Sequence, residues 1–262
     1  MTVQAWIANR LRRFRWMFTF RRLLLDWQPA WQALLAHQRG VTLRLRDGLV
    51  LQGGDRDDVA GIFNEIFVER CYTPSWFYRP EPGHTVLDVG ANIGVFPLFL
   101  HSIAPGIRVL AFEPHPVTFR QLMENLRANR LEEKVQAYQL AVSQGPGVVR
   151  FSGASGIESG HEAATAEGHG EAVESIGLAE AVARAGQPID LLKVDTEGAE
   201  AEIITAAPAT TWSRIARAVV EYHDLQKRDQ VVHALEQQGY PCRVVPARGY
   251  EHHLGLIYAR RA

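Results

Sequence analysis

Acidic residues and glycines follow two short apolar runs near the middle of the chain. "VLDVGANIG" places Asp88 before a turn made by Gly90, Asn92 and Gly94, and Glu113 follows the next apolar run, "VLAF". Glycines let the backbone approach a ligand closely, and a carboxylate at the end of a second strand can accept hydrogen bonds from both ribose hydroxyls. This order of strand, turn, helix, strand and carboxylate predicts a nucleoside site.

The residues of the turn narrow the class of nucleoside. A dinucleotide-binding turn has glycine at three positions, but here Asn92 takes the second and Val95 the third. Asp88 would repel a diphosphate and suits a cationic ligand. S-adenosylmethionine combines a ribose with a sulfonium and an ammonium group and carries no phosphate, so it fits this pattern. An NAD-dependent oxidoreductase is the rival reading, which Asn92 and Val95 oppose.

Two further polar segments predict the catalytic side of the site. "DLLKVDTEGAE" places Asp195 after an apolar run, and "VVEYHD" places His223 after another. An alcohol must lose its proton when it is methylated, so His223, which titrates near neutral pH, and Asp195 are the candidate catalytic residues. The other interpretation of "EYHD" is structural, with Asp224 as the cap of the following helix.

A metal-assisted version of this chemistry would use the same strand ends. Asp195, Glu221 and Asp224 lie where carboxylates could hold Mg²⁺. We expect no metal ion and keep this triad as the alternative.

The elements that must position these residues follow one another from residue 84 onwards. Strand-like and helix-like segments alternate, which is typical of a parallel sheet covered on both faces. Ligands of such sheets bind beyond the carboxyl ends of the strands, where all the residues above are expected. The expected strands are 85–89, 108–113, 135–142, 189–195, 217–223, 242–246 and 254–260, and the helices between them start near 94, 115, 199 and 225.

The first 83 residues are expected to form an extension to a domain spanning 84–262. Residues 1–36 are helical and amphipathic in pattern with an interruption at Pro29, and residues 41–52 alternate around Asp47-Gly48 as a hairpin does. Seven arginines against Asp26 alone make residues 1–40 basic. Such a helix could pack on the domain, pack on a second subunit of a homodimer or lie on a membrane surface; RNA binding is the least favoured reading.

Bulk properties exclude several classes of protein. The formal net charge of −1 argues against nucleic acid as a partner. Cys71 and Cys242 are far apart in the sequence, so we expect reduced thiols and a cytoplasmic protein. Residues 1–36 are the one segment that could reach the inner membrane surface. We expect residues 153–170, which include His161 and His169, to form a substrate loop or to be disordered. We expect His252 and His253 to lie on the surface.

Four segments together resemble the FkbM family of S-adenosylmethionine-dependent methyltransferases. They are "VLDVGANIGVF", "AFEP", "DLLKVDTEGAE" and "VVEYHD", and the resemblance covers residues 84–259. It implies an α/β, Rossmann-like class I fold with a seven-stranded, mostly parallel sheet, and methylation of a hydroxyl on a small molecule or saccharide.

The resemblance also assigns the cofactor site. Asp88, Gly90, Asn92 and Gly94 would line the methionine end, Glu113 would bind the ribose, and Pro114 and Val142 complete the predicted cofactor-binding set. A cofactor-binding or membrane-associated scaffold without turnover is the alternative function.

Overall fold

The computed structural model describes residues 3–151, 171–247 and 254–261. The expectations for the loop 153–170, with His161 and His169, and for His252 and His253 lie outside these residues.

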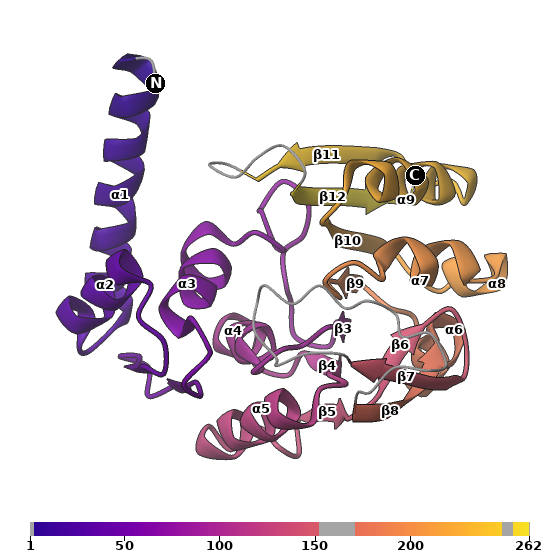
Figure 1. Ribbon diagram of the computed structural model, residues 1–262, viewed down its shortest axis with the longest axis horizontal. Coiled ribbons are helices and arrows are strands. Elements are labelled where there is room, and N and C mark those ends of the chain that lie inside the picture. The colour runs from indigo at the N-terminus through magenta and orange to yellow at the C-terminus, as the bar shows by residue number, and fades with distance from the viewer. Residues whose placement is uncertain (1–2, 152–170, 248–253, 262) are drawn as a thin grey trace.

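The main sheet has seven strands, as the family resemblance implies, and their order is β11-β12-β10-β9-β3-β4-β5 (Figure 1). Only β12 runs antiparallel to its neighbours, and the other contacts are parallel. All residues of β3 and β9 are buried, because these apolar central strands are covered on both faces. The strands are β3 (Thr85–Val89), β4 (Arg108–Phe112), β5 (Val135–Tyr138), β9 (Leu191–Val194), β10 (Arg217–Tyr222), β11 (Cys242–Pro246) and β12 (Gly255–Arg260).

Helices cover the two faces of the sheet in two separate hydrophobic clusters. Val86 faces α4 and α5, whereas Leu87, the next residue of β3, faces α6, α7 and α9, as alternation along a strand requires. Figure 1 shows these two groups on opposite sides of the sheet. The helices are α4 (Val95–Ile103), α5 (Pro116–Ala128), α6 (Leu178–Arg184), α7 (Glu200–Ala206), α8 (Ala209–Trp212) and α9 (Leu225–Gln237).

A small second sheet interrupts this alternation, and it corrects the strand expected over 135–142. That segment divides into β5, which ends at Tyr138, and β6 (Ala141–Ser143), which leaves the main sheet. β6 pairs with β8 (Glu171–Gly177), and β8 pairs with β7 (Gly147–Phe151). The strand-like pattern continues past Gln139 to Val142, so it does not mark the point where the chain changes sheets.

The first 83 residues contain two helices, a hairpin and a short helical segment. α1 (Val3–Leu23) and α2 (Trp27–Ala36) precede β1 (Thr42–Arg44) and β2 (Val50–Gln52), and α3 (Val59–Phe63) continues into the π-helical η1 (Asn64–Glu69). The break between the first two helices comes before Trp27, so Pro29 lies in the first turn of α2, where proline is tolerated. Among the described helices, none has the length and apolar character needed to cross a membrane.

The hairpin is fastened to α5 by two asparagine side chains. The Asn125 side chain accepts from the Gln52 N–H at 2.9 Å and donates to the Gln52 carbonyl at 2.8 Å. Asn129, one helical turn later, repeats this pair of bonds with Val50 at 2.8 and 2.7 Å. The asparagines thereby replace a partner strand for the outer edge of β2, and they hold the loop that follows it beside the main sheet.

Candidate functional site

The turn after β3 brings the backbone against the end of β9. Gly90, Asn92 and Gly94 have φ values of 79°, 49° and 84°, which lie in the left-handed region. A Cβ atom at Gly90 would stand 1.7 Å from the carbonyl oxygen of Asp195. Glycine at this position therefore allows the two strand ends to meet.

Glu113 is a buried carboxyl group held at the end of β4. Its Oε2 accepts a hydrogen bond from the backbone N–H of Asn92 at 2.9 Å, and its Oε1 accepts one from the N–H of His115, also at 2.9 Å. Burial raises the pKa of Glu113 to about 7, although these two hydrogen bonds act in the opposite direction. The carboxyl group links the two turns that follow β3 and β4.

A cleft of about 1030 Å³ opens along the carboxyl edge of the sheet. Five of the seven residues predicted to bind the cofactor line it, namely Gly90, Asn92, Glu113, Pro114 and Val142. Asp88 and Gly94 are not among the lining residues: Asp88 is buried in β3, and Gly94 caps α4. Residues 54–57 and β7 also line the cleft, and sequence reasoning did not predict either contribution.

Lys193 is a buried cation beneath the cleft. Its Nζ lies 3.1 Å from Asp88 Oδ1 and 3.5 Å from Asp195 Oδ2, and it donates to the Gly90 carbonyl at 2.5 Å. Burial alone would lower the pKa of Lys193, but Asp88 and Asp195 outweigh it and raise the pKa. Lys193 therefore joins β3, the glycine turn and the end of β9 through one charge.

Tyr72 brings the N-terminal extension into the site. Its hydroxyl lies 3.0 Å from Asp195 Oδ2 and 3.0 Å from Glu221 Oε2. Burial and the neighbouring Asp195 raise the pKa of Glu221 well above its usual value. The contact joins residues more than 120 positions apart, and nothing in the local sequence around Tyr72 indicates it.

His223 lies behind the turn that follows β9, with carboxylates at both ring nitrogens. Nε2 is 3.3 Å from Glu197 Oε2, and Nδ1 is 3.3 Å from Glu200 Oε1. Burial would lower the pKa of His223, but Glu200 and then Glu197 reverse this effect and raise it to about 9. His223 is not among the residues that line the cleft, whereas Asp195 and Glu197 are.

Of the three carboxylates considered for Mg²⁺, Asp195 and Glu221 share the Tyr72 hydroxyl, whereas Asp224 is engaged elsewhere. Asp224 caps α9 by accepting from the N–H groups of Gln226 and Lys227 at 2.8 and 2.9 Å, as the structural interpretation of "EYHD" expects. In the described part of the chain, the group of three with ligand atoms within 4.8 Å of one another is instead Asp195, Glu197 and His223.

The three groups are of the types that bind divalent metal ions, and Nδ1 of His223 faces Glu200, as the outer nitrogen of a metal-bound imidazole faces a carboxylate. The expectation that no metal ion binds stays a prediction.

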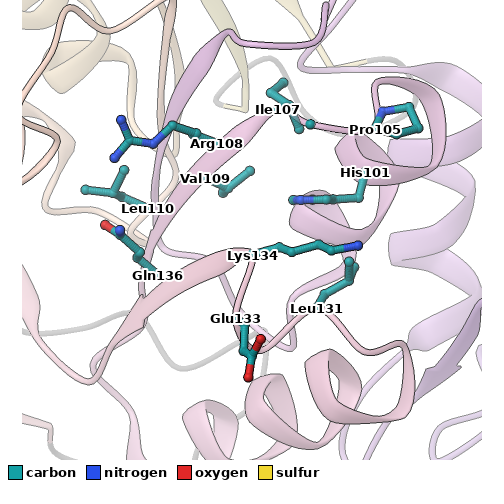
Figure 2. A pocket seen from close by; sticks show the side chains of 11 residues that line it. His101, Pro105, Ile107, Arg108, Val109, Leu110, Leu131, Glu133, Lys134 and Gln136 are labelled. Carbon is teal, nitrogen blue, oxygen red and sulfur yellow. The ribbon is translucent and has the colours of Figure 1, made fainter.

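A second pocket, of about 520 Å³, lies at the opposite edge of the sheet, where β4 begins (Figure 2). Figure 2 shows side chains from α4, from β4 and from the segment before β5 around it. None of the predicted site residues lines it, so the candidate site is the cleft at the carboxyl edge. Its lining residues are His101, Pro105, Gly106, Ile107, Arg108, Val109, Leu110, Leu131, Glu133, Lys134 and Gln136.

Comparison with known proteins identifies the family. Residues 88–246 match the methyltransferase FkbM domain. The 31-O-demethyl-FK506 methyltransferase FkbM of Streptomyces tacrolimicus is 33% identical over 76% of this chain and 88% of its own. The chain belongs to the FkbM methyltransferase family. Methyltransferase sdnD of Sordaria araneosa is a second relative, with 28% identity. The match covers 76% of this FkbM-family chain and 89% of the Sordaria araneosa protein.

A solved structure shows the same fold for an FkbM protein. Methyltransferase FkbM from Methylobacillus flagellatus KT superimposes with a TM-score of 0.52 at 14% identity, over 97% of this chain and 60% of its own. The family resemblance and the class I α/β fold expected from the sequence are thus confirmed. Membership makes this chain an S-adenosylmethionine-dependent methyltransferase.

The cleft fits S-adenosylmethionine as the methyl donor. It has the size of a small-molecule site, and the carboxyl group of Glu113 lies in its wall at the end of β4. Apolar side chains from Phe112 and Val142 line it beside polar groups, which suits a ligand that is partly apolar and partly charged.

Proposed function

We propose that this FkbM-family enzyme transfers a methyl group from S-adenosylmethionine to a hydroxyl group of a small molecule or saccharide. The observation that carries the proposal is the Asp195 carboxyl group, which lines the cleft and is held from two sides by Tyr72 and Lys193. The relative from Streptomyces tacrolimicus is named as the methyltransferase of 31-O-demethyl-FK506, which supports oxygen as the acceptor atom.

The cofactor is assigned to the cleft in one orientation. Glu113 binds the ribose, Gly90 and Asn92 border the methionine end, and Pro114 and Val142 border the rest of the nucleoside. Asp88 and Gly94 act as positioning residues in this proposal. Asp88 holds Lys193 beneath the turn, and Gly94 begins α4 with a left-handed backbone that permits the turn.

Asp195 is the proposed proton acceptor. The acceptor oxygen forms a bond to the methyl carbon as the bond from carbon to sulfur breaks, and the hydroxyl proton passes to the Asp195 carboxylate. Tyr72 and Lys193 both approach Oδ2, so we assign Oδ1 to the incoming hydroxyl. Alignment of the two substrates supplies most of the rate enhancement in such a displacement.

A single hydrogen on Tyr72 explains how Asp195 is held. The Tyr72 hydroxyl has one hydrogen but two carboxyl neighbours at 3.0 Å, so one of these carboxyl groups must supply a hydrogen of its own. The raised pKa of Glu221 makes it the protonated member. Glu221 then donates to Tyr72, and Tyr72 donates to Asp195, which orients the carboxylate that receives the proton.

His223 has a different role in this proposal, although it is one of the two predicted catalytic residues. With a pKa raised to about 9, its imidazole is protonated at neutral pH and cannot accept a further proton. We assign it to holding Glu197 and Glu200, which shape the turn between β9 and α7.

The proposal is tested with matched acceptors that differ in a single group. Purified enzyme and isotopically labelled S-adenosylmethionine are incubated with pairs of sugars and polyketide-like alcohols that carry either a hydroxyl or an amine at the same position. Mass spectrometry and NMR are expected to find the label on oxygen. Label found only on nitrogen or carbon, or cofactor binding without product in any pair, would refute O-methylation.

A further inference from the structure

One face of α1 exposes large apolar side chains to solvent. Leu11, Phe14 and Phe18 are 65%, 55% and 68% exposed. Their spacing of three and four residues places them along one stripe of the helix. Three large apolar groups in a row on a 21-residue helix form a continuous apolar surface rather than scattered exposures.

Within the described residues, the stripe stays largely exposed and the packing of α1 uses another face. The opposite face of α1 carries Phe20, which is fully buried, and Leu24, directly after the helix, is buried as well. Phe20 meets Trp31 of α2 and Phe63 of α3 edge-on, at ring distances of 5.7 and 5.2 Å. Figure 1 shows the N-terminal part of α1 standing away from the sheet. The helix is therefore anchored by one face at its C-terminal end and presents the other outward.

The charges that α1 itself carries have a single sign, and one of them, Arg15, pairs with Glu69 of η1. α1 contains six arginines and no acidic residue. Arg13, Arg21 and Arg22 are exposed. At about 100° per residue, Arg21 flanks one side of the stripe and Arg22 the other. A surface that covers this face must be anionic and must also accept apolar side chains.

Only one class of partner supplies both properties at once. A second α1 would bring a further six positive charges against the first, which opposes pairing of the helices. Nucleic acid supplies phosphates, but its backbone has no apolar layer for Phe14 and Phe18. The surface of an anionic bilayer supplies lipid headgroups for the arginines and an acyl boundary for the apolar stripe.

We propose that α1 is a monotopic anchor that lies on an anionic lipid surface, with Leu11, Phe14 and Phe18 inserted at the acyl boundary. The anchor does not depend on the proposed methyl acceptor. It would place the enzyme at a membrane while the catalytic cleft stays in water.

The test is co-sedimentation of the full chain with vesicles of phosphatidylcholine alone or with added phosphatidylglycerol. Binding is expected only to the anionic vesicles. Phe14→Ser with Phe18→Ser is expected to weaken it about tenfold or more. Arg21→Gln with Arg22→Gln is expected to weaken it about 30-fold, since each arginine near such a surface is worth roughly fivefold. The matched control, Arg120→Gln with Arg127→Gln, removes two exposed charges from α5 and should leave binding unchanged.

Several results would overturn the proposal. One is a full chain that fails to bind anionic vesicles, and another is a variant without Phe14 and Phe18 that binds them as the wild type does. The third such result is an α5 control variant that binds the vesicles as weakly as the α1 variants do. Light scattering that shows a dimer lost in the Phe14/Phe18 variant would assign the face to a second copy instead. Tighter binding to an RNA oligonucleotide than to the vesicles would assign it to nucleic acid. Circular dichroism and cofactor binding are expected to stay at wild-type level in all variants.

Discussion

Glu113 shows how the environment of one side chain suits it for a ribose. Its two carboxyl oxygens are each fixed by a backbone N–H, at 2.9 Å in both cases. An ionised carboxylate accepts several hydrogen bonds, so Glu113 can accept from the ribose hydroxyls while it keeps its two hydrogen bonds from the backbone. Burial raises the pKa of this group to about 7, which brings its titration into the range where the enzyme can be assayed.

Cofactor affinity should therefore depend on pH through Glu113. The carboxylate form that accepts from the ribose is lost as the pH falls through about 7. The affinity for S-adenosylhomocysteine is expected to fall about tenfold between pH 8 and pH 6. Calorimetry on Glu113→Gln should give weaker binding without this dependence, and the exposed Glu124→Gln should behave as wild type. A pH dependence that persists in Glu113→Gln would assign it to another group.

His223 should contribute stability rather than turnover. Its folded pKa of about 9 lies above its ordinary value of 6.5, so the stabilisation is complete below pH 6.5 and is lost as the pH rises through 9. His223→Gln is expected to lower the free energy of unfolding by on the order of 3 kcal/mol at pH 6.5 and by much less at pH 10. Urea titrations at both values measure this. Methyl transfer at pH 7.5 should stay within about tenfold of wild type; complete loss in a folded variant would restore His223 as the base.

The order of residues along the chain predicted part of the site. Glu113 and the glycine turn follow consecutive strands of one parallel sheet, so their meeting is a consequence of topology. Tyr72 reaches Asp195 from the extension, and no periodicity relates those two positions. The protonation of His223 depends on Glu197 and Glu200, and Glu197 has a left-handed backbone, at φ 56°, that its residue type does not indicate.

Between elements, the junction of β2 with α5 lies next to residues 54–57, which line the cleft. Asn125 is fully buried and bonds to both backbone groups of Gln52 and to the carbonyl of Ile93 in the glycine turn. One side chain thus connects the hairpin, α5 and the turn below the cofactor cleft.

Loss of the Asn125 amide should loosen the hairpin. Asn125→Ala leaves three backbone groups without their partner, and we expect a destabilisation of about 3 kcal/mol. Arg127→Ala, on the exposed side of the same helix, is the matched control and should change stability by less than about 0.5 kcal/mol. Urea unfolding compares the two. Equal effects of both substitutions would show that helix propensity, and not the junction, is responsible.

The sequence predicted most elements and missed where one strand ends. Continuous apolar runs identified β3, β9 and β10, because buried parallel strands must be apolar on both faces. The pattern of residues 135–142 is strand-like throughout, yet the chain leaves the main sheet after Tyr138 and Ala141 starts another. That exit depends on pairing between β6 and β8, which are more than 25 residues apart.

At the scale of the whole molecule, the N-terminal extension and the methyltransferase domain share one hydrophobic cluster. Phe67 of η1 stacks on Phe63 at 4.7 Å and meets Phe99 of α4 edge-on at 5.1 Å. Tyr72 meets Phe96 of the same helix in a similar way. The division at residue 83 stays a prediction, since this packing makes the extension part of the support of the site.

This shared core predicts that the chain unfolds as a unit. Phe67→Ala removes a ring that is 6% exposed, and it is expected to cost about 3–5 kcal/mol. The unfolding transitions measured by circular dichroism and by tryptophan fluorescence should coincide in wild type and variant. An early fluorescence transition, confined to the tryptophans of α2, would instead show that the extension unfolds by itself.

The central claim is that a carboxylate at the end of β9 receives the proton of a hydroxyl during methyl transfer. Single-turnover methyl transfer by Asp195→Asn, at saturating cofactor and with an acceptor accepted by the wild type, tests it most directly. We expect the rate to fall by about 10²–10⁴-fold, while calorimetry finds the affinity for S-adenosylhomocysteine within a few-fold of wild type. A variant that binds the cofactor and still transfers the methyl group at the wild-type rate would contradict the account.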